Sequence, residues 1–355
     1  MAARVTAAVT GTGSYLPPDT LDNFQLLEMG TLRESFDIEQ ARSALKGVEG
    51  AGRLSGPEVF DHWAFQLTGI KSRRYIARGS DLTTEDMCAR AGLAALEAAG
   101  REPSEIDMLY VASVSASDDV PNMACSVAKE IGNPQLGGYA INAACAGFVY
   151  GVGAAWSSIV SGMAERVLVV SGDALTRVID YTDVRTAVVF ADGAGAAVLE
   201  RCEGDTGVMG PPAVSGEFAR DPLYLVGQAW REEDDRVPIL HMDGGPRILR
   251  NAVVKMAEIG KRALEKAGLD WSDVDLVIPH QANMRITRGL EQRLELPKGR
   301  VVHNIEDRGN MSASTVAVTL DEVMRGRHGP VPEPATIVLT SIGGGYTMAA
   351  AVVRI

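Results

Sequence analysis

Residues 95–107 read ALEAAGREPSEID and residues 263–275 read ALEKAGLDWSDVD, so one pattern occurs twice, 168 residues apart. In both copies a helix-like run stops at a glycine and leads into an apolar, strand-like run, MLYVAS in the first and LVIP in the second. The shared register through helix, turn and strand indicates a duplicated fold, and two copies are too few for a solenoid. We therefore expect two similar halves, residues 1–204 and 205–355, which meet where CEGDTG interrupts the pattern.

The segments around the first copy alternate between helix-like and strand-like patterns. Residues 83–100 begin with two threonines and acidic residues, carry apolar residues at helical spacing and end at glycine, which predicts a helix. Residues 138–144 and 166–172 are short apolar runs with little alternation, typical of strands buried on both faces. Such strands with helices between them predict an α/β architecture. Residues 30–62 are rich in charges and glycines and interrupt the first half. We expect them to form either a structured cap over an entrance or a solvated surface excursion.

The composition excludes several classes of protein. A formal net charge of −12 argues against a nucleic-acid partner, because phosphate binding needs a concentrated basic surface. No apolar run approaches the roughly 18 residues needed to span a bilayer, and the first residues lack the pattern of a signal peptide. These two absences predict a cytoplasmic location. The four cysteines are scattered without paired spacing, so reduced thiols are expected.

Cys145 lies in the stretch INAACAGFVYG, residues 141–151. Cysteine is among the most buried residue types, so a core residue is the simplest interpretation. However, the pattern puts Cys145 on a turn between a strand and the start of a helix, where unpaired amides and the helix dipole lower a thiol pKa. The small neighbouring residues also leave room for a substrate close to the backbone. These features favour a nucleophile.

Three further stretches contain groups that a nucleophile needs. In VIPHQANMRI, Pro279 sets His280 just beyond a buried strand, where open α/β sheets hold their sites, although a hydrogen-bonded structural histidine is the alternative. In EDRGNMSAS, Asn310 supplies an amide on a turn, a common arrangement that carries little weight alone. In LTSIGGGYTMAAAVV, three glycines join two strand-like runs, as in a flexible hairpin or in a backbone that approaches a ligand.

Taken in order, these stretches resemble the β-ketoacyl-acyl-carrier-protein synthase III group of thiolase-fold condensing enzymes. The matching motifs are NAACAGF, PHQAN, GNMSASTV and GGGYT, supported by SGDALTRVIDYTD and VVFADGAGAAVLE. The resemblance runs from about residue 5 to residue 355, apart from the extra residues between about 30 and 60. It implies a five-layered αβαβα fold of two duplicated halves and a homodimer.

The resemblance also implies a mechanism. Cys145 would carry an acyl group, while the backbone N–H groups of Cys145 and Gly344 would bind the tetrahedral oxyanion. His280 and Asn310 would polarise a malonyl-type thioester during loss of CO₂, and the resulting carbanion would attack the acyl group. An acyl carrier protein would deliver thioesters, with coenzyme A as the other carrier. The reaction requires neither a metal nor a redox cofactor.

The sequence departs from the family at positions that bind coenzyme A. Trp63 matches the residue that stacks on the adenine, but Leu67 stands where an arginine completes the clamp. Val120 stands where the family limits the acyl pocket across the dimer, and a valine should admit more than acetyl. Arg285 matches a basic residue at the tunnel mouth. Together these features predict a specialised synthase for longer acyl chains in polyketide or fatty-acid-like secondary metabolism. The residues expected to bind substrate or carrier are Trp63, Val120, Arg250, Asn283 and Arg285.

Three other functions remain open at this level. The same fold could transfer the acyl group to an alcohol or amine, or could join two chains without decarboxylation. It could also be a non-catalytic partner subunit, although such chains usually lose the cysteine or the histidine. Release of CO₂ from a malonyl donor separates decarboxylative condensation from the other two reactions.

Overall fold

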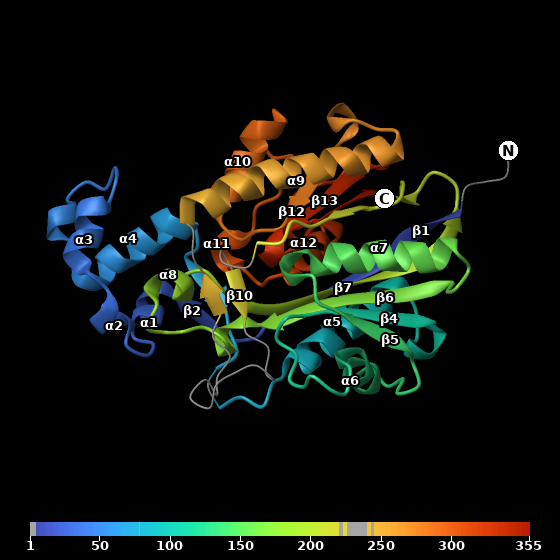
Figure 1. The fold of residues 1–355 in the computed structure, drawn as a ribbon, viewed down its shortest axis with the longest axis horizontal. Coiled ribbons are helices and arrows are strands. Elements are labelled where there is room, and N and C mark those ends of the chain that lie inside the picture. Colours follow the sequence, from blue (N-terminus) through green and yellow to red (C-terminus); the bar gives the residue numbers. More distant parts are fainter. Residues whose placement is uncertain (1–4, 78, 220–222, 226–239, 243–244) are drawn as a thin grey trace.

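The computed structural model describes residues 5–77, 79–219, 223–225, 240–242 and 245–355. Two β-sheets form its centre (Figure 1). In the first the strand order is β1 (Val5–Tyr15), β7 (Asp192–Glu203), β6 (Arg166–Ala174), β4 (Met108–Ala112) and β5 (Gly138–Ile141). In the second the order is β12 (Leu276–Pro279), β13 (Thr336–Ile342), β14 (Met348–Arg354) and β8 (Gly207–Val208), with β9 (Ala213–Ser215) also paired to β14.

Helices cover both sheets and separate them. Two helices, α7 (Gly147–Val160) and α12 (Ser314–Met324), contact strands of both sheets and form the middle layer. The outer face of the first sheet packs against α5 (Thr84–Ala99) and α6 (Met123–Glu130), and that of the second against α9 (Gly245–Ala267), which in turn contacts α10 (Met284–Leu294). The five layers follow one another from top to bottom in Figure 1. The predicted αβαβα architecture is confirmed.

The duplicated sequence pattern forms the same local structure twice. In the first copy α5 ends at Gly100, whose φ is 64°, and is followed by the short helix η2 (Pro103–Glu105) and by β4. In the second, α9 is followed by Gly268 with a φ of 74°, then by η6 (Trp271–Asp273) and β12. Glycine suits both helix ends because it adopts a positive φ without strain. The first sheet contains strands only from residues 5–203 and the second only from residues 207–354. The division of the chain into two units between residues 204 and 205 stays a prediction.

The predictions for individual elements were correct except at β5. Residues 84–99 form the expected helix, capped by reciprocal hydrogen bonds between Thr83 and Asp86. Strand β6 is buried along almost its whole length. Strand β5 was expected to be buried on both faces, but Tyr139 and Ala140 are exposed, because β5 is the edge strand of the first sheet.

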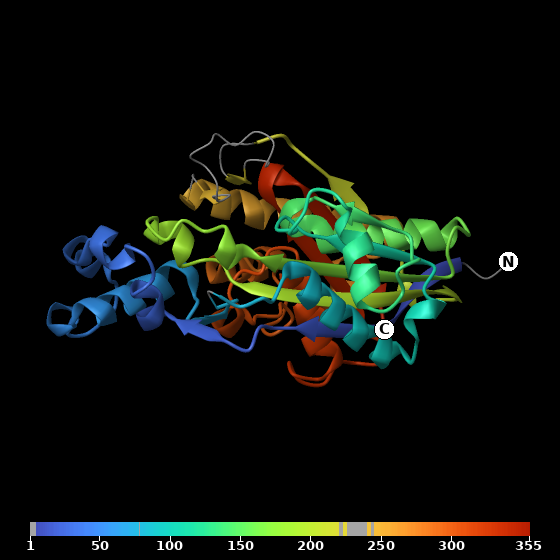
Figure 2. The ribbon, with the colours of Figure 1, turned by 90° about the horizontal axis from the view of Figure 1, so that it is seen from below.

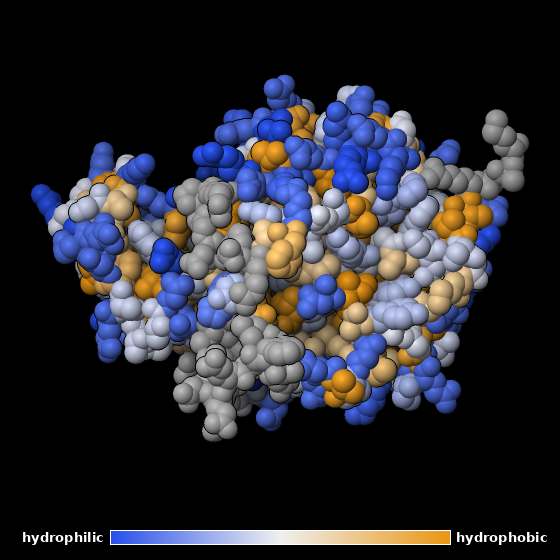
Figure 3. Space-filling model, in the orientation of Figure 1, coloured by the Kyte–Doolittle hydropathy of each residue, from blue (hydrophilic) through white to orange (hydrophobic). Residues whose placement is uncertain are grey.

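Residues 30–62 belong to a lobe at one end of the molecule (Figures 1 and 2). Its helices are α1 (Asn23–Leu27), α2 (Leu32–Ser35), α3 (Ile38–Ala44), η1 (Ala51–Arg53) and α4 (Gly56–Thr68). Phe36 and Phe60, whose rings meet edge to face at 4.9 Å, belong to a core that the lobe shares with residues 175–190 of the main body. Figure 3 shows polar side chains among apolar ones on its surface. The lobe reaches the cavity described below at Leu67 and Thr68 of α4, and the described lining of that cavity includes no residue from 30–62.

The described chain also contains shorter elements. Strand β2 (Thr20–Asp22) pairs with β3 (Ser72–Arg74), β10 (Leu223–Leu225) pairs with β11 (Leu240–Met242), and η4 (Leu175–Arg177) and η7 (Gly344–Tyr346) are single helical turns. Two short helices are α8 (Val184–Ala187) and α11 (Ile305–Arg308). Within the described segments, no helix combines the length and the apolar composition needed to cross a bilayer.

Candidate active site

Cys145 lies on η3 (Ala144–Ala146), the single turn that joins β5 to the start of α7. Ala144, just before it, has a positive φ of 48°, which is unusual for a residue other than glycine. The second half of the chain holds this turn in position. Ser341 Oγ donates to Cys145 O at 2.6 Å, and Thr347 Oγ1 donates to Ala143 O at 2.8 Å. The conformation around the thiol therefore depends on contacts between the two halves.

The three glycines form the turn between β13 and β14, against the backbone of Cys145. A Cβ atom on Gly343 would lie 2.6 Å from Cys145 N, so no larger residue fits without displacing this turn. The Gly343 N–H donates to Thr347 O at 2.8 Å. In the described part of the chain the Gly344 N–H has no acceptor, and Gly344 and Cys145 line the same cavity. This arrangement is compatible with the expected oxyanion donors, Cys145 and Gly344, which stay a prediction.

His280 follows the last residue of β12, as the position of Pro279 predicts. The residue is 2% exposed, and its backbone N–H donates to Thr340 O at 2.8 Å. Its ring atom Nδ1 lies 2.7 Å from Thr315 Oγ1. Burial lowers the pKa of His280 from 6.5 to about 4, although a hydrogen bond to the Ser312 backbone opposes this change. The imidazole is consequently neutral at physiological pH.

The low pKa of His280 predicts a loss of stability in acid. Between pH 6.5 and pH 4 the unfolded chain binds a proton at this histidine that the folded protein excludes, so stability falls as pH falls through this range. The effect at pH 4.5 is about 2 to 3 kcal/mol. Urea unfolding of the wild type and of H280Q at pH 7 and pH 4.5 checks it. We expect H280Q to lose less stability on acidification by about that amount, and equal losses would contradict the assigned pKa.

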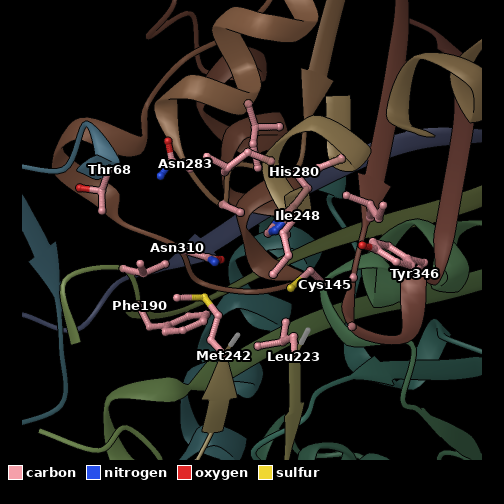
Figure 4. Close-up of a pocket in the computed structure, with 18 of the residues that line it drawn as sticks. Thr68, Cys145, Phe190, Leu223, Met242, Ile248, His280, Asn283, Asn310 and Tyr346 are labelled. Carbon is pink, nitrogen blue, oxygen red and sulfur yellow. The ribbon is translucent and has the colours of Figure 1, made fainter. Parts of the chain in front are cut away.

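Asn310 precedes α12 on a turn of unusual geometry. Its Oδ1 accepts a hydrogen bond from Ser312 N at 2.9 Å, and Ser312 has a positive φ of 53°. Because Oδ1 is engaged in this way, the amide group of Asn310 is left as the donor that faces the cavity. In Figure 4 the side chains of Asn310, His280 and Cys145 approach the same space from different parts of the fold.

Two cavities meet at Cys145. The first, of about 210 Å³, is lined by Cys145, His280 and Asn310, and its remaining surface is mainly apolar, as Phe190 and Met242 illustrate (Figure 4). The second, of about 960 Å³, is also lined by Cys145. Its described lining includes serines of the segment after β4 and apolar residues of β10 and β11. A thiol between two cavities can receive a reactant from one and direct the transferred group into the other.

The expectation of a lowered thiol pKa at Cys145 is wrong for this geometry. The side chain is only 7% exposed, and burial raises the pKa of Cys145 to about 12. A hydrogen bond from the Ser312 hydroxyl and the N–H of Cys145 itself oppose the rise, while the negative charge of Asp173 adds to it. Desolvation thus outweighs the favourable position before α7, and Cys145 is a thiol at neutral pH.

The structure separates the predicted substrate- and carrier-binding residues into two groups. Asn283 lines the first cavity and joins it to the lobe, because its Nδ2 donates to Leu67 O at 2.9 Å. Arg285 is exposed nearby and donates to Gln66 O at 2.6 Å, and Arg250 is exposed on α9.

The other two predicted residues lie outside the described lining of both cavities. The ring of Trp63 packs 5.2 Å from that of Phe36 and 6.1 Å from that of Phe60. Val120 is 87% exposed. The roles of these residues stay predictions.

Sequence reasoning missed three residues at the site: Ser312, Thr315 and Asp173. Thr315 contacts His280, and Ser312 contacts Cys145, with Ser312 Oγ 3.7 Å from Cys145 Sγ. All three lie inside the motifs GNMSASTV and SGDALTRVIDYTD. Those motifs pointed to the right segments but not to these side chains.

Known proteins resemble the chain over its whole length. The family described as 3-Oxoacyl-[acyl-carrier-protein (ACP)] synthase III matches residues 139–211, and its C-terminal counterpart matches residues 264–355. A relative from Cereibacter sphaeroides, named Beta-ketoacyl-[acyl-carrier-protein] synthase III, is 36% identical and the match covers 99% of both chains.

Solved structures of two such synthases also resemble the chain in fold. The 3-oxoacyl-[acyl-carrier-protein] synthase III of Aquifex aeolicus VF5 has a TM-score of 0.82 at 31% identity, covering 98% of this chain and all of its own. The priming β-ketosynthase of the R1128 polyketide pathway has a TM-score of 0.83 at 30% identity, covering 99% of this chain and 97% of its own.

Proposed function

Since the chain belongs to the 3-oxoacyl-[acyl-carrier-protein] synthase III family, we propose that Cys145 accepts an acyl group from a thioester and that His280 and Asn310 drive its condensation with a malonyl-type thioester. The protein is an acyltransferase, a ketosynthase that performs decarboxylative condensation in fatty-acid or polyketide priming. The observation that supports the residue assignment is the convergence of one thiol, one imidazole and one amide on a single cavity.

In the first step the sulfur of Cys145 attacks the carbonyl carbon of an acyl thioester. The tetrahedral oxyanion then needs fixed donors, and the N–H groups of Cys145 and Gly344 can supply them at the lining of the first cavity, whose surface is mainly apolar. One such donor contributes about 3 kcal/mol in other enzymes. The acyl group stays on the sulfur as a new thioester.

In the second step a malonyl-type thioester enters the first cavity and loses CO₂. Negative charge develops on its thioester oxygen, which His280 and Asn310 stabilise as neutral hydrogen-bond donors. Burial keeps the pKa of His280 near 4, so the imidazole does not need to lose a charge before it acts. Donation from Nε2 requires Nδ1 to be unprotonated, and the Thr315 hydroxyl 2.7 Å from Nδ1 would then have to donate to it in place of Ser312 O, to which it donates at 2.9 Å. The carbanion attacks the Cys145 thioester and forms a β-ketoacyl product.

The acyl donor is longer than acetyl and arrives on an acyl carrier protein. Three observations support this: the second cavity at Cys145 measures about 960 Å³, the Trp63 ring packs against Phe36 inside the lobe, and Leu67 stands where the family has the arginine of an adenine clamp. A phosphopantetheine arm attached to a carrier protein needs no such clamp. This specificity fits a specialised pathway that starts from a preformed chain.

Donor choice can be measured by the mass of the intact protein. The wild type is mixed with acetyl, hexanoyl and decanoyl thioesters, each on coenzyme A and on acyl carrier protein, and the rate of loading on Cys145 is recorded. We expect the longer chains on the carrier protein to load at least about tenfold faster than acetyl-coenzyme A, a difference of about 1.4 kcal/mol. Acetyl-coenzyme A as the best donor of the panel would contradict the proposed specificity.

Two further parts of the proposal concern assembly and location. The exposed edge strand β5 and the exposed Val120 support a homodimer, because an unpaired strand edge offers hydrogen bonds to a second copy. Exposed Arg250 and Arg285 support docking of an acidic carrier protein beside the first cavity. Four free cysteines support a cytoplasmic location, since disulfides are rare there.

A further inference from the structure

The second cavity reaches past the ends of two strands, from the middle layer of the fold to an outer layer. Cys145 lines it from η3, at the start of α7, and Thr84 lines it from the first turn of α5. These two helices lie on opposite faces of the first sheet (Figure 1). Much of the other described lining comes from the segments that follow β4 and β6 and from β10 and β11. An acyl chain on Cys145 that fills this cavity therefore runs toward the start of α5.

The described lining has an apolar part and a polar part. The apolar side chains come mainly from β10, β11 and the segment after β6, and Val178, Leu223 and Leu240 are examples. The polar side chains come from the start of α5, from the segment before it and from the segment after β4, and they include Asp81, Thr83, Thr84, Ser115, Ser117 and Asp119. A plain alkyl chain can satisfy only the apolar part. A chain with a polar group toward its free end can satisfy both.

Thr84 is the most deeply buried of these six polar residues. It is 3% exposed, and its Oγ1 donates to Ser115 O at 2.8 Å. The Ser115 hydroxyl lies 3.5 Å from Thr84 Oγ1, but it donates its proton to Asp173 Oδ1 at 3.0 Å. Because a hydroxyl group has only one proton, Thr84 can meet a ligand only as an acceptor. A buried acceptor without a donor is unfavourable, so a donor on the ligand is stabilised at this position.

A second hydroxyl group, at the exposed rim of the cavity, has the same polarity. Ser117 Oγ donates to Glu85 Oε2 at 2.7 Å, and Ser117 N donates to Glu85 Oε1 at 2.9 Å. Glu85 is buried, and both of its carboxyl oxygens are engaged in this way. The Ser117 proton is therefore held by Glu85, and Ser117 Oγ also meets a ligand as an acceptor.

The charged groups of the lining favour the same kind of ligand. Two exposed carboxylates, Asp81 and Asp119, lie on the lining, and neither forms an ion pair with another described residue. Arg177 is the only cation in the described lining, and its Nη2 already donates to Ser80 O at 2.9 Å and to Leu82 O at 3.3 Å. Acidic groups thus outnumber basic ones, which disfavours a carboxylate on the chain and favours a protonated amine.

We propose that the acyl chain loaded on Cys145 carries a hydrogen-bond donor, a hydroxyl group or an amine, toward its free end, and that Thr84 Oγ1 accepts from it. The inference rests on the proposed function and specifies its substrate class. Thr84 is then a specificity-determining residue, because it distinguishes such a chain from a plain alkyl chain of the same length. A chain that ends in an acceptor alone gains nothing, since it would face the acceptor oxygen of Thr84.

The test compares chains that differ only at the free end. The probes are N-acetylcysteamine thioesters of nonanoyl, 8-hydroxyoctanoyl, 8-aminooctanoyl and 8-methoxyoctanoyl chains, with a shorter and a longer set of the same design. Loading on Cys145 is followed by the mass of the intact protein. We expect the wild type to load a hydroxyl or amino chain about tenfold faster than the alkyl chain of equal length, the effect of one buried hydrogen bond. The methoxy chain, which has an acceptor but no donor, should load no faster than the alkyl chain. The faster of the hydroxyl and amino chains identifies the donor.

Variants of Thr84 assign this preference to one residue. T84V keeps the shape of the side chain and removes the acceptor, so the rate ratio of donor chain to alkyl chain should fall to within about twofold of unity. T84S retains the hydroxyl group and should restore the ratio. The matched control is T6V, because Thr6 is also buried and donates to a backbone carbonyl, Val208 O, but lines neither cavity in the described structure. T6V should keep the wild-type ratio.

Equal loading of donor and alkyl chains at all three lengths would overturn the substrate class, and a ratio unchanged in T84V would overturn the role of Thr84. Calorimetric binding of the same thioesters to C145A measures the preference without any reaction at the thiol. Tighter binding of the donor chain to C145A, with no loading of the wild type, would support the substrate class and reject the proposed function. Loading of Cys145 without any preference would support the proposed function and reject the substrate class.

Discussion

The C145A variant is expected to lose acyl loading completely and to retain the fold. Without the sulfur no covalent intermediate forms, so condensation should fall by a factor on the order of 10⁴ or more, as in other enzymes that lose their nucleophile. The cavity on each side of the residue should remain, because alanine differs from cysteine only by one sulfur atom. Intact-mass spectrometry with an acyl carrier-protein donor measures the loading, and product formation with a malonyl thioester measures the turnover.

The matched control for this variant is C125A. Cys125 is a free, exposed cysteine on α6, outside the described lining of both cavities. We expect C125A to load and condense at the wild-type rate. Loading that persisted in C145A but disappeared in C125A would show that Cys125, and not Cys145, carries the acyl group.

Variants of His280 and Asn310 should separate the two steps. Both side chains face the first cavity, and in the proposed mechanism both act on the malonyl-type thioester rather than on the acyl donor. H280A and N310A should therefore retain acyl loading within a few-fold of the wild type. Each should reduce decarboxylation by about 10²- to 10³-fold, the usual effect of removing one oxyanion donor. Release of labelled CO₂ from a malonyl thioester measures the second step independently of the first.

A half-buried asparagine away from the site supplies the control for N310A. Asn133 donates from Nδ2 to Pro103 O at 3.0 Å and lines neither cavity in the described structure. N133A should leave both steps unchanged. If N310A and H280A blocked loading as strongly as decarboxylation, they would act on Cys145 itself and the division of roles would be wrong.

The sequence was most informative where local patterns determine local structure. The repeated helix, turn and strand are set by apolar spacing and by Gly100 and Gly268, so their structure could be predicted from the local sequence pattern. The positions of Cys145 and His280 could be predicted in the same way. A residue on the turn after a strand lies at the edge of the sheet, whichever strand it follows.

Other features depend on contacts between distant segments. The Ser312 and Asp173 side chains are far apart in sequence, and only the packing of the two sheets around α12 and β6 brings both toward Cys145. The thiol pKa was predicted in the wrong direction for the same reason. Helix position is visible in the sequence, whereas desolvation arises from tertiary packing. Similarly, no local pattern shows that Phe36 of the lobe packs against Trp63.

The ratio of CO₂ released to β-ketoacyl product formed tests the central claim most directly. The protein is first loaded with an acyl group, the adduct is located on Cys145 by peptide mass spectrometry, and carboxyl-labelled malonyl carrier protein is then added. The account predicts that the adduct disappears as one CO₂ is released for each β-ketoacyl product. An adduct that passes to another acceptor with no CO₂ released, or a condensation product formed with no adduct on Cys145, would contradict it.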